Sequence, residues 1–160
     1  DAQNLDPSIG VYAMDLFTGN ADSSFNGGNA RGFDFAASAI HGDAYAADVL
    51  PTAGGKLLVG GGYEYGGFAF GEAALARLNL DGSFDSSFGN LSARLPGRMG
   101  YGHSLLGSDR DNRLASMALS ADRERVVFSG FAYSSNDGSH YASVMRARLH
   151  ATDLLRNGFE

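Results

Sequence analysis

The sequence predicts an all-β protein made of repeated antiparallel sheets, and three observations lead to this fold class. Glycine is abundant, at 23 of 160 residues, whereas proline contributes only 3, a balance that suits tight turns better than a low-complexity linker. Short apolar runs bounded by glycines recur along the chain, as in 54–62. A phrase of the form Asp-Ser-Ser-Phe recurs as well. Many short strands joined by glycine-rich turns fit all three observations.

The repeats divide the chain into units. Residues 54–90 form the clearest copy, with a strand, a loop rich in glycine and aromatic residues, a second strand, and the terminator Asp-Ser-Ser-Phe-Gly. The phenylalanine of the terminator recurs at Phe25, Phe88 and Phe159, spaced by 63 and 71 residues, and such a period is typical of repeat architectures. We therefore expect a single β-repeat domain with one partial unit and two full units. Their bounds are 1–28, 29–90 and 91–160.

Matching strands are expected at corresponding places in the units. The first full unit carries them at 46–50, 56–61 and 73–79. The second carries them at 114–119, 125–130 and 144–150. The partial unit contributes one strand at 11–16, before its own terminator.

A helical interpretation competes for 73–80 and 143–157, because both segments are rich in Ala, Leu, Met and Arg, which are good helix formers. Over 145–149, however, apolar residues and arginines alternate with a period of two, as they do in a half-buried strand. The first segment also leads into Asp81-Gly82, a tight-turn signal that suits a hairpin. The strand interpretation is therefore favoured for both segments.

Composition and charge exclude several classes of protein. A chain of 160 residues has the length of one domain, and 44% hydrophobic with 19% charged residues excludes a disordered acidic polymer. A net charge of -6 argues against a nucleic-acid partner, because phosphate contacts need basic residues. The absence of cysteine excludes disulfides and thiolate metal sites. No run of 18 apolar residues occurs, so we expect no transmembrane segment.

The sequence begins with the polar residues 1–4 and without Met. We expect an exported protein, periplasmic, cell-surface or extracellular, whose signal peptide has been removed. The alternative is that residues preceding Asp1 are missing from the sequence. The lack of cysteine does not decide between an envelope and a cytosolic location.

The stretch ALARLNLDGSFDSSFG at 74–89, preceded by GGKLLVGGG at 54–62, resembles the bacterial delta-60 repeat. The opening at 5–10 is similar to the way such proteins often begin. The resemblance covers most of the chain, whereas the terminator at 155–159 departs from the pattern. The resemblance implies an exported bacterial protein with β-propeller-like blades. It implies no defined activity, so no catalytic residue is carried over from the family.

The number of repeats raises a physical problem. A propeller needs at least four blades to close, and this chain supplies about two and a half. An unclosed array leaves sheet edges and one sheet face uncovered, which favours pairing with another chain. We therefore expect self-association, other protein partners, or membership of a longer polypeptide.

The loop at 61–71 is the most suggestive segment for binding. Its aromatic residues alternate with small ones, and such side chains can pack between units, form a subunit contact, or stack on a glycan or another small ligand. Aromatic residues recur at 131–133, which favours packing. The candidate ligand or interface residues are Tyr63, Tyr65, Phe68 and Phe70.

The terminators are expected to be structural. Asp and Ser side chains tighten turns through hydrogen bonds to the backbone, and the phenylalanine that follows can anchor the turn in the core. No Gly-x-Ser-x-Gly elbow accompanies the serines, which argues against a nucleophile. The structural turn residues are Asp22, Phe25, Asp81, Gly82, Asp85 and Phe88.

The histidines do not form a zinc motif, since no two lie four residues apart and no glutamate accompanies them. Solvated loop positions are the favoured interpretation for all four, which are His41, His103, His140 and His150. An enzyme built on this chain would use His41 or His103 with a nearby aspartate.

Other polar segments also lack a complete motif. Residues 108–112 resemble the start of a calcium loop but lack its glycine and distal glutamate, so a polar turn is favoured and bound calcium stays open. Residues 97–103 lack the Lys-Ser/Thr of a phosphate loop. Nothing fixes the separation of Asp34, Asp43 and Asp48 as a glycosidase pair would require. We expect no catalytic residue, no metal and no cofactor.

The functional expectation follows from the unclosed repeats and the absence of a catalytic set. The leading hypothesis is a non-enzymatic exported β-repeat protein that acts as a structural or accessory subunit of a larger cell-envelope or extracellular assembly. The alternative is a glycan- or ligand-binding, lectin-like module that uses the aromatic loop. A third hypothesis is a propeller-type hydrolase or lyase.

Overall fold

The computed structural model describes residues 9–35, 41–52, 54–65, 71–89, 97–101, 111–134 and 137–149. These residues form three antiparallel sheets and contain no α-helix, which confirms the all-β fold class. The first sheet pairs β1 (Ile9–Val11) with β2 (Arg31–Phe33). The second has the order β3 (His41–Thr52), β4 (Lys56–Tyr65), β5 (Gly71–Leu78) and β6 (Arg98–Tyr101). The third has the order β7 (Asp111–Leu119), β8 (Arg125–Ser134) and β9 (Ser139–Arg148).

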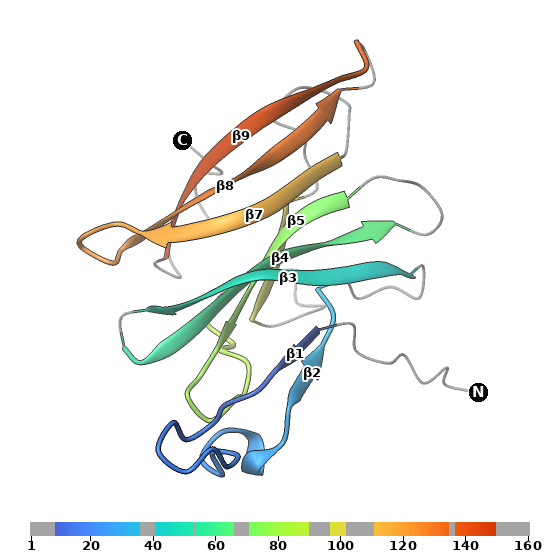
Figure 1. Ribbon diagram of the computed structural model, residues 1–160. Helices are drawn as coiled ribbons and strands as arrows, with labels where there is room; N and C mark the ends of the chain where they lie inside the picture. Colours follow the sequence, from blue (N-terminus) through green and yellow to red (C-terminus); the bar gives the residue numbers. More distant parts are fainter. Residues whose placement is uncertain are drawn as a thin grey trace.

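The sheets are stacked in chain order (Figure 1). Two hydrophobic cores lie between them. The first core joins the sheet β1–β2 to the sheet β3–β6; its members include Ile9, Phe25, Phe33, Val59, Ala74, Ala76 and Leu78. The second core joins β3–β6 to β7–β9; its members include Leu58, Ala73, Leu75, Phe88, Met117, Phe128 and Leu149. The middle sheet is therefore covered on both faces.

The double covering explains why β5 carries the composition of a helix. Successive side chains of a strand point to opposite faces of its sheet, and each residue of β5 is buried. Ala73 and Leu75 enter the second core, whereas Ala74 and Leu78 enter the first. A strand buried on both faces reads as a nearly continuous apolar run. The strand interpretation of 73–79 and 143–150 is confirmed by β5 and β9 over 73–78 and 143–148.

The expected strand at 11–16 is wrong from residue 12 onward. β1 ends at Val11, and Met14 forms only an isolated bridge with Ala21. The cause is Asp15, whose carboxylate accepts hydrogen bonds from the N–H groups of Phe17 (2.8 Å) and Thr18 (2.9 Å). Such a side-chain turn competes with an extended backbone, so the chain reverses at this point.

The strand that follows each terminator forms an antiparallel pair with the strand that precedes the same terminator. β2 pairs with β1 across the terminator that ends at Phe25, and β6 pairs with β5 across the terminator that ends at Phe88. Each of these sheets therefore extends past the end of its sequence unit. Residue 28 and residue 90 divide the repeats in sequence, but they do not divide the sheets.

The second and third sheets repeat the same irregularity, a register shift in their first strand. It lies between Ala46 and Asp48 in β3, and between Leu114 and Ser116 in β7. A glycine faces each shift, because a Cβ at Gly61 would lie 1.9 Å from the carbonyl oxygen of Tyr45. A Cβ at Gly130 would lie 1.7 Å from the carbonyl oxygen of Arg113. The repeat is thus structural as well as sequential.

The array is open, because no strand of the first sheet pairs with a strand of the third within the described ranges. In the same part of the chain, no helix has the length and hydrophobicity to cross a lipid bilayer.

Candidate functional site

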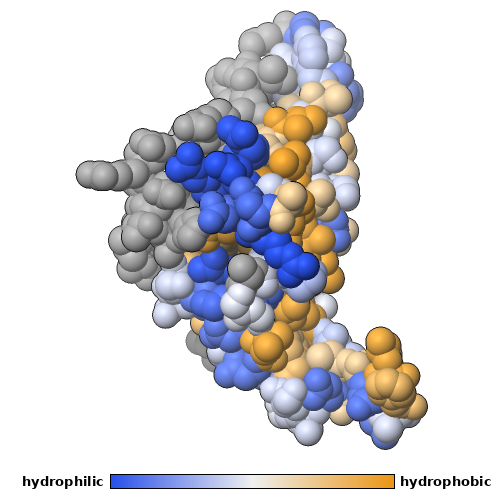
Figure 2. Space-filling view, turned by 90° about the vertical axis from the view of Figure 1, so that its left-hand side faces the viewer, coloured by the Kyte–Doolittle hydropathy of each residue, from blue (hydrophilic) through white to orange (hydrophobic). Residues whose placement is uncertain are grey.

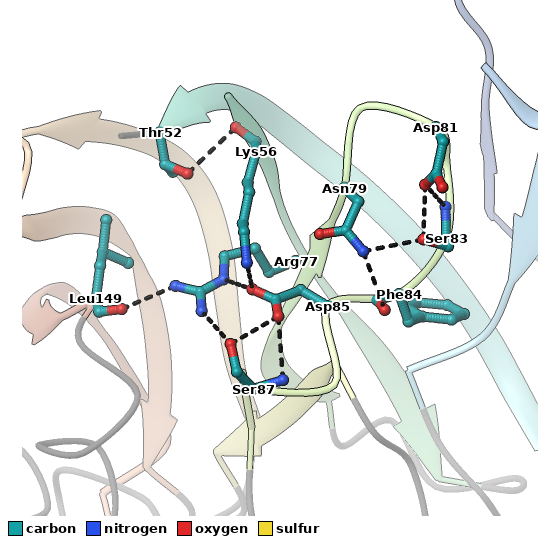
Figure 3. A network of polar contacts seen from close by, with 10 residues as sticks. All are labelled: Thr52, Lys56, Arg77, Asn79, Asp81, Ser83, Phe84, Asp85, Ser87 and Leu149. Atoms are coloured by element: carbon teal, nitrogen blue, oxygen red, sulfur yellow. Dashed lines mark hydrogen bonds and ion pairs between the residues drawn. The ribbon is translucent and has the colours of Figure 1, made fainter. Parts of the chain in front are cut away.

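The best-defined polar site is the joint at the terminator of the first full unit (Figure 3). Asp85 Oδ2 accepts hydrogen bonds from Lys56 Nζ and Arg77 Nε, both at 2.6 Å. Asp85 Oδ1 accepts from the backbone N–H and the hydroxyl of Ser87, at 3.0 and 2.6 Å. Arg77 also donates from Nη1 to the carbonyl oxygen of Leu149 at 2.8 Å. The carboxylate of Asp85 therefore links β4, β5 and the terminator. Arg77, one of its two cationic donors, also links this joint to the residue after β9.

The environment of the joint keeps Asp85 ionised. Burial raises the pKa of this carboxyl group, but the hydrogen bonds from Lys56 and Ser87 and the charge of Arg77 outweigh burial. The pKa of Asp85 therefore lies well below its ordinary value. A buried carboxylate with both oxygens occupied by donors is a weak candidate for a general base, because it has little affinity for a proton. The arrangement is that of a structural joint.

The lowered pKa of Asp85 predicts a loss of stability in acid. A group whose pKa is lower in the folded state contributes stability that is fully present above its unfolded pKa, about 4. That contribution disappears as the pH falls toward the folded value. We expect the difference in unfolding free energy between wild type and Asp85→Asn to be constant from pH 7 to pH 5. Below about pH 4 it should shrink by about 1.4 kcal/mol per pH unit.

Urea unfolding of both proteins over this pH range measures the difference. The comparison with the variant removes the contribution of the other aspartates whose pKa values are also lowered; these are Asp15, Asp22, Asp81, Asp122 and Asp137. A difference that stays constant down to pH 2 would show that the joint does not hold the carboxylate in its charged form.

The other terminator residues form turns of the same kind. Asp22 accepts hydrogen bonds from the N–H (2.9 Å) and hydroxyl (2.7 Å) of Ser24. Asp81 accepts the corresponding pair from Ser83, at 2.9 and 2.6 Å. Gly82 follows with a φ of +81°, a conformation that glycine adopts without strain. The two anchoring side chains, Phe25 and Phe88, are buried in the first and the second core respectively.

The aromatic loop is described only in part. Tyr63 lies in the first core and its hydroxyl donates to the carboxylate of Glu72, so this side chain packs between two sheets. The backbone of Tyr65 belongs to β4, but its side chain lies outside the described part, as do Phe68 and Phe70. Three of the four candidate residues therefore have no described contacts.

Among the four histidines considered as bases or metal ligands, only His140 has a described side chain, and it lies on a strand and not in the expected loop. His140 is exposed on β9 beside the rings of Tyr133 (5.1 Å) and Phe131 (6.0 Å). His41 belongs to β3 by its backbone. The remaining positions have side chains outside the described residues: His41, Asp43, His103, residues 108–111 and His150. Where side chains are described, no three His, Asp or Glu residues gather as a metal site would require.

Two contacts between sheets could not be predicted from the sequence. Asp48 Oδ2 accepts a hydrogen bond from the N–H of Met117 (2.9 Å), which ties β3 to the register shift of β7. The bond from Arg77 to Leu149 ties β5 to the residue after β9. The aligned arginines, Arg77 and Arg148, were the available signal, but alignment does not say that the first arginine reaches into the next unit.

Apolar side chains are exposed at both ends of the array. At the β1–β2 end, Tyr12, Met14, Leu16 and Phe17 are exposed, and apolar surface gathers on the lobe at the bottom of the molecule (Figure 2). At the β7–β9 end, the exposed large apolar residues include Val127, Phe131 and Val144. Exposed apolar surface of this kind marks interaction sites.

The chain matches no family model, no curated protein and no solved structure. Its own repeated geometry is therefore the basis for a functional conclusion.

Proposed function

We propose that the chain is a non-enzymatic exported β-repeat protein of the delta-60 type, with β-propeller-like blades. It acts as a structural or accessory subunit of a larger cell-envelope or extracellular assembly. One observation carries the proposal: positions that are buried in the middle sheet are exposed in the third sheet. Leu75 is 1% exposed, whereas Val144, which holds the equivalent register position in the third sheet, is 70% exposed. An apolar face of this kind is stable in water only at a cost that a covering partner removes.

The polar chemistry of the described residues supports a structural role. The joint around Asp85 uses its charges to bind strands together, and Asp48 uses its carboxylate to hold a neighbouring backbone. The terminator aspartates hold turns. These groups stabilise the repeat, and a protein assembled from such units needs no further chemistry to serve as a scaffold.

The native mass of the purified chain, compared with its denatured mass of 16.7 kDa, tests the proposal. We expect a native mass that is a multiple of the denatured mass and that rises with protein concentration, because covering the apolar faces favours association. Sedimentation equilibrium over a range of concentrations measures it. A well-folded monomer at every concentration would contradict assembly from copies of this chain.

A further inference from the structure

The two interfaces between neighbouring sheets have the same orientation along the chain. Each sheet has one face toward the preceding sheet in the chain, which we call its leading face, and one toward the following sheet, its trailing face. The trailing face of β1–β2 meets the leading face of β3–β6 in the first core. The trailing face of β3–β6 meets the leading face of β7–β9 in the second core. Two further faces, one at each end of the array, have no such cover among the described residues.

The uncovered trailing face belongs to β7–β9. Its central residues are paired across β8 and β9, with Val127 opposite Arg146, Ser129 opposite Val144, and Phe131 opposite Ala142. The equivalent of Val127 in the middle sheet is Leu58, and Leu58 is 0% exposed, whereas Val127 is 36% exposed. The same face that the third sheet covers in the middle unit is therefore open in the third.

The uncovered leading face belongs to β1–β2. The N–H of Asp22 donates to the carbonyl of Ala13, just as the N–H of Asp85 donates to the carbonyl of Arg77, so Ala13 is the counterpart of Arg77. Its neighbours Tyr12 and Met14, each 53% exposed, then correspond to Ala76 and Leu78, each 0% exposed. The segment that follows β1 thus exposes the apolar positions that the equivalent part of β5 buries.

We propose that these two faces bind each other between copies of the chain, so that the β7–β9 trailing face of one copy covers the β1–β2 leading face of the next. In this contact a trailing face meets a leading face, as in both interfaces within the chain. Charge supports the same pairing. Three arginines lie on the trailing face, Arg125, Arg146 and Arg148, and the turns that follow β1 carry the exposed Asp15 and the half-buried Asp22. A symmetric contact between two trailing faces would instead bring arginines against arginines, which is unfavourable.

The proposed contact is heterologous, because two different surfaces meet, and such contacts produce rings or open filaments. This inference rests on the proposed function, in which copies of the chain assemble. It adds the two surfaces, their orientation and the requirement that each copy contributes a different end.

Complementation between two variants tests the inference. Val144→Asp places a charge on the trailing face and leaves the first sheet intact, whereas Tyr12→Asp does the reverse. We expect each variant alone to associate at least about tenfold more weakly than wild type, because a carboxylate would be buried in an apolar contact. Mixed together, they should form a heterodimer, since one wild-type trailing face and one wild-type leading face remain. Val49→Asp is the matched control, because Val49 is exposed on β3 of the middle sheet.

Sedimentation velocity of each variant and of their mixture reads the result, and circular dichroism checks that both variants are folded. If Val144→Asp is unfolded, Phe131→Ser replaces it on the same face. Association that persists in either variant, or a mixture that stays monomeric, would overturn the inference while leaving assembly itself in place. A wild-type monomer at every concentration would overturn the inference and the proposed self-assembly together.

Discussion

Asp85→Asn is expected to lower the free energy of unfolding by about 3 kcal/mol, one of the two largest effects that we predict for a single substitution. Asp85 is 5% exposed and its Oδ2 receives both Lys56 Nζ and Arg77 Nε at 2.6 Å. Asparagine preserves the shape and the acceptor for Ser87, but it removes the charge and presents an amide to two cations. Removal of one partner from a buried ion pair leaves the other charge without compensation, and this cost dominates.

Asp81→Asn is the matched control for that experiment. Asp81 forms the same turn with Ser83, but it is exposed and its carboxylate lies at the surface. We expect its substitution to cost less than about 1 kcal/mol, as surface substitutions usually do. Urea unfolding at pH 7 compares the two variants. Equal losses would show that the turn, and not the buried charge, is the source of the stability.

Gly130→Ala is expected to be at least as damaging, with a loss of about 3 kcal/mol or more in the free energy of unfolding. The added Cβ would lie 1.7 Å from the carbonyl oxygen of Arg113, and the contacted atom belongs to the backbone of the neighbouring strand. A backbone cannot move aside as the end of a flexible side chain can, so the register shift of β7 would have to be rebuilt. Gly61→Ala should behave alike, because its Cβ would meet the carbonyl oxygen of Tyr45 at 1.9 Å.

Gly10→Ala provides the control for both glycines, because nothing lies within 4 Å of a Cβ at this position. Thermal unfolding should show a fall in midpoint of roughly 10 °C for Gly130→Ala and little change for Gly10→Ala. A stable Gly130→Ala protein would mean that the two strands can separate at the register shift without loss, which would weaken the structural equivalence of the two sheets.

Much of the local structure could be predicted from the sequence. A glycine-bounded apolar run predicted β4, and its aligned copy at 125–130 predicted β8. Alternation of apolar residues with arginines predicted β9 against a helical composition. The terminators form the expected turns, since the carboxylate of an aspartate accepts a hydrogen bond from the backbone N–H of the serine two residues later. The prediction failed at 12–16, where the turn of Asp15 ends the strand early.

Contacts between units could not be predicted in the same way. The strand after each terminator pairs with the strand before it. Strands as short as β2 and β6 contain too few residues for their sequence to indicate which strand they pair with. Asp48 binds a backbone N–H 69 residues away. Backbone groups look alike in any sequence, so the identity of a distant backbone partner depends on how the sheets stack.

The sequence by itself determined the features whose energy comes from neighbours along the chain: the repeat, the terminator turns and the strand periodicity. Only the tertiary structure decided which repeated residues are buried. Arg77 lies opposite Leu58 in the second sheet, and Arg146 lies opposite the equivalent Val127 in the third. Arg77 is nevertheless buried and donates to Leu149, the residue after β9, whereas Arg146 is exposed. The physical reason is that burial is a property of the covering sheet and not of the residue. The third sheet covers the second, and within the described structure no further sheet covers the third.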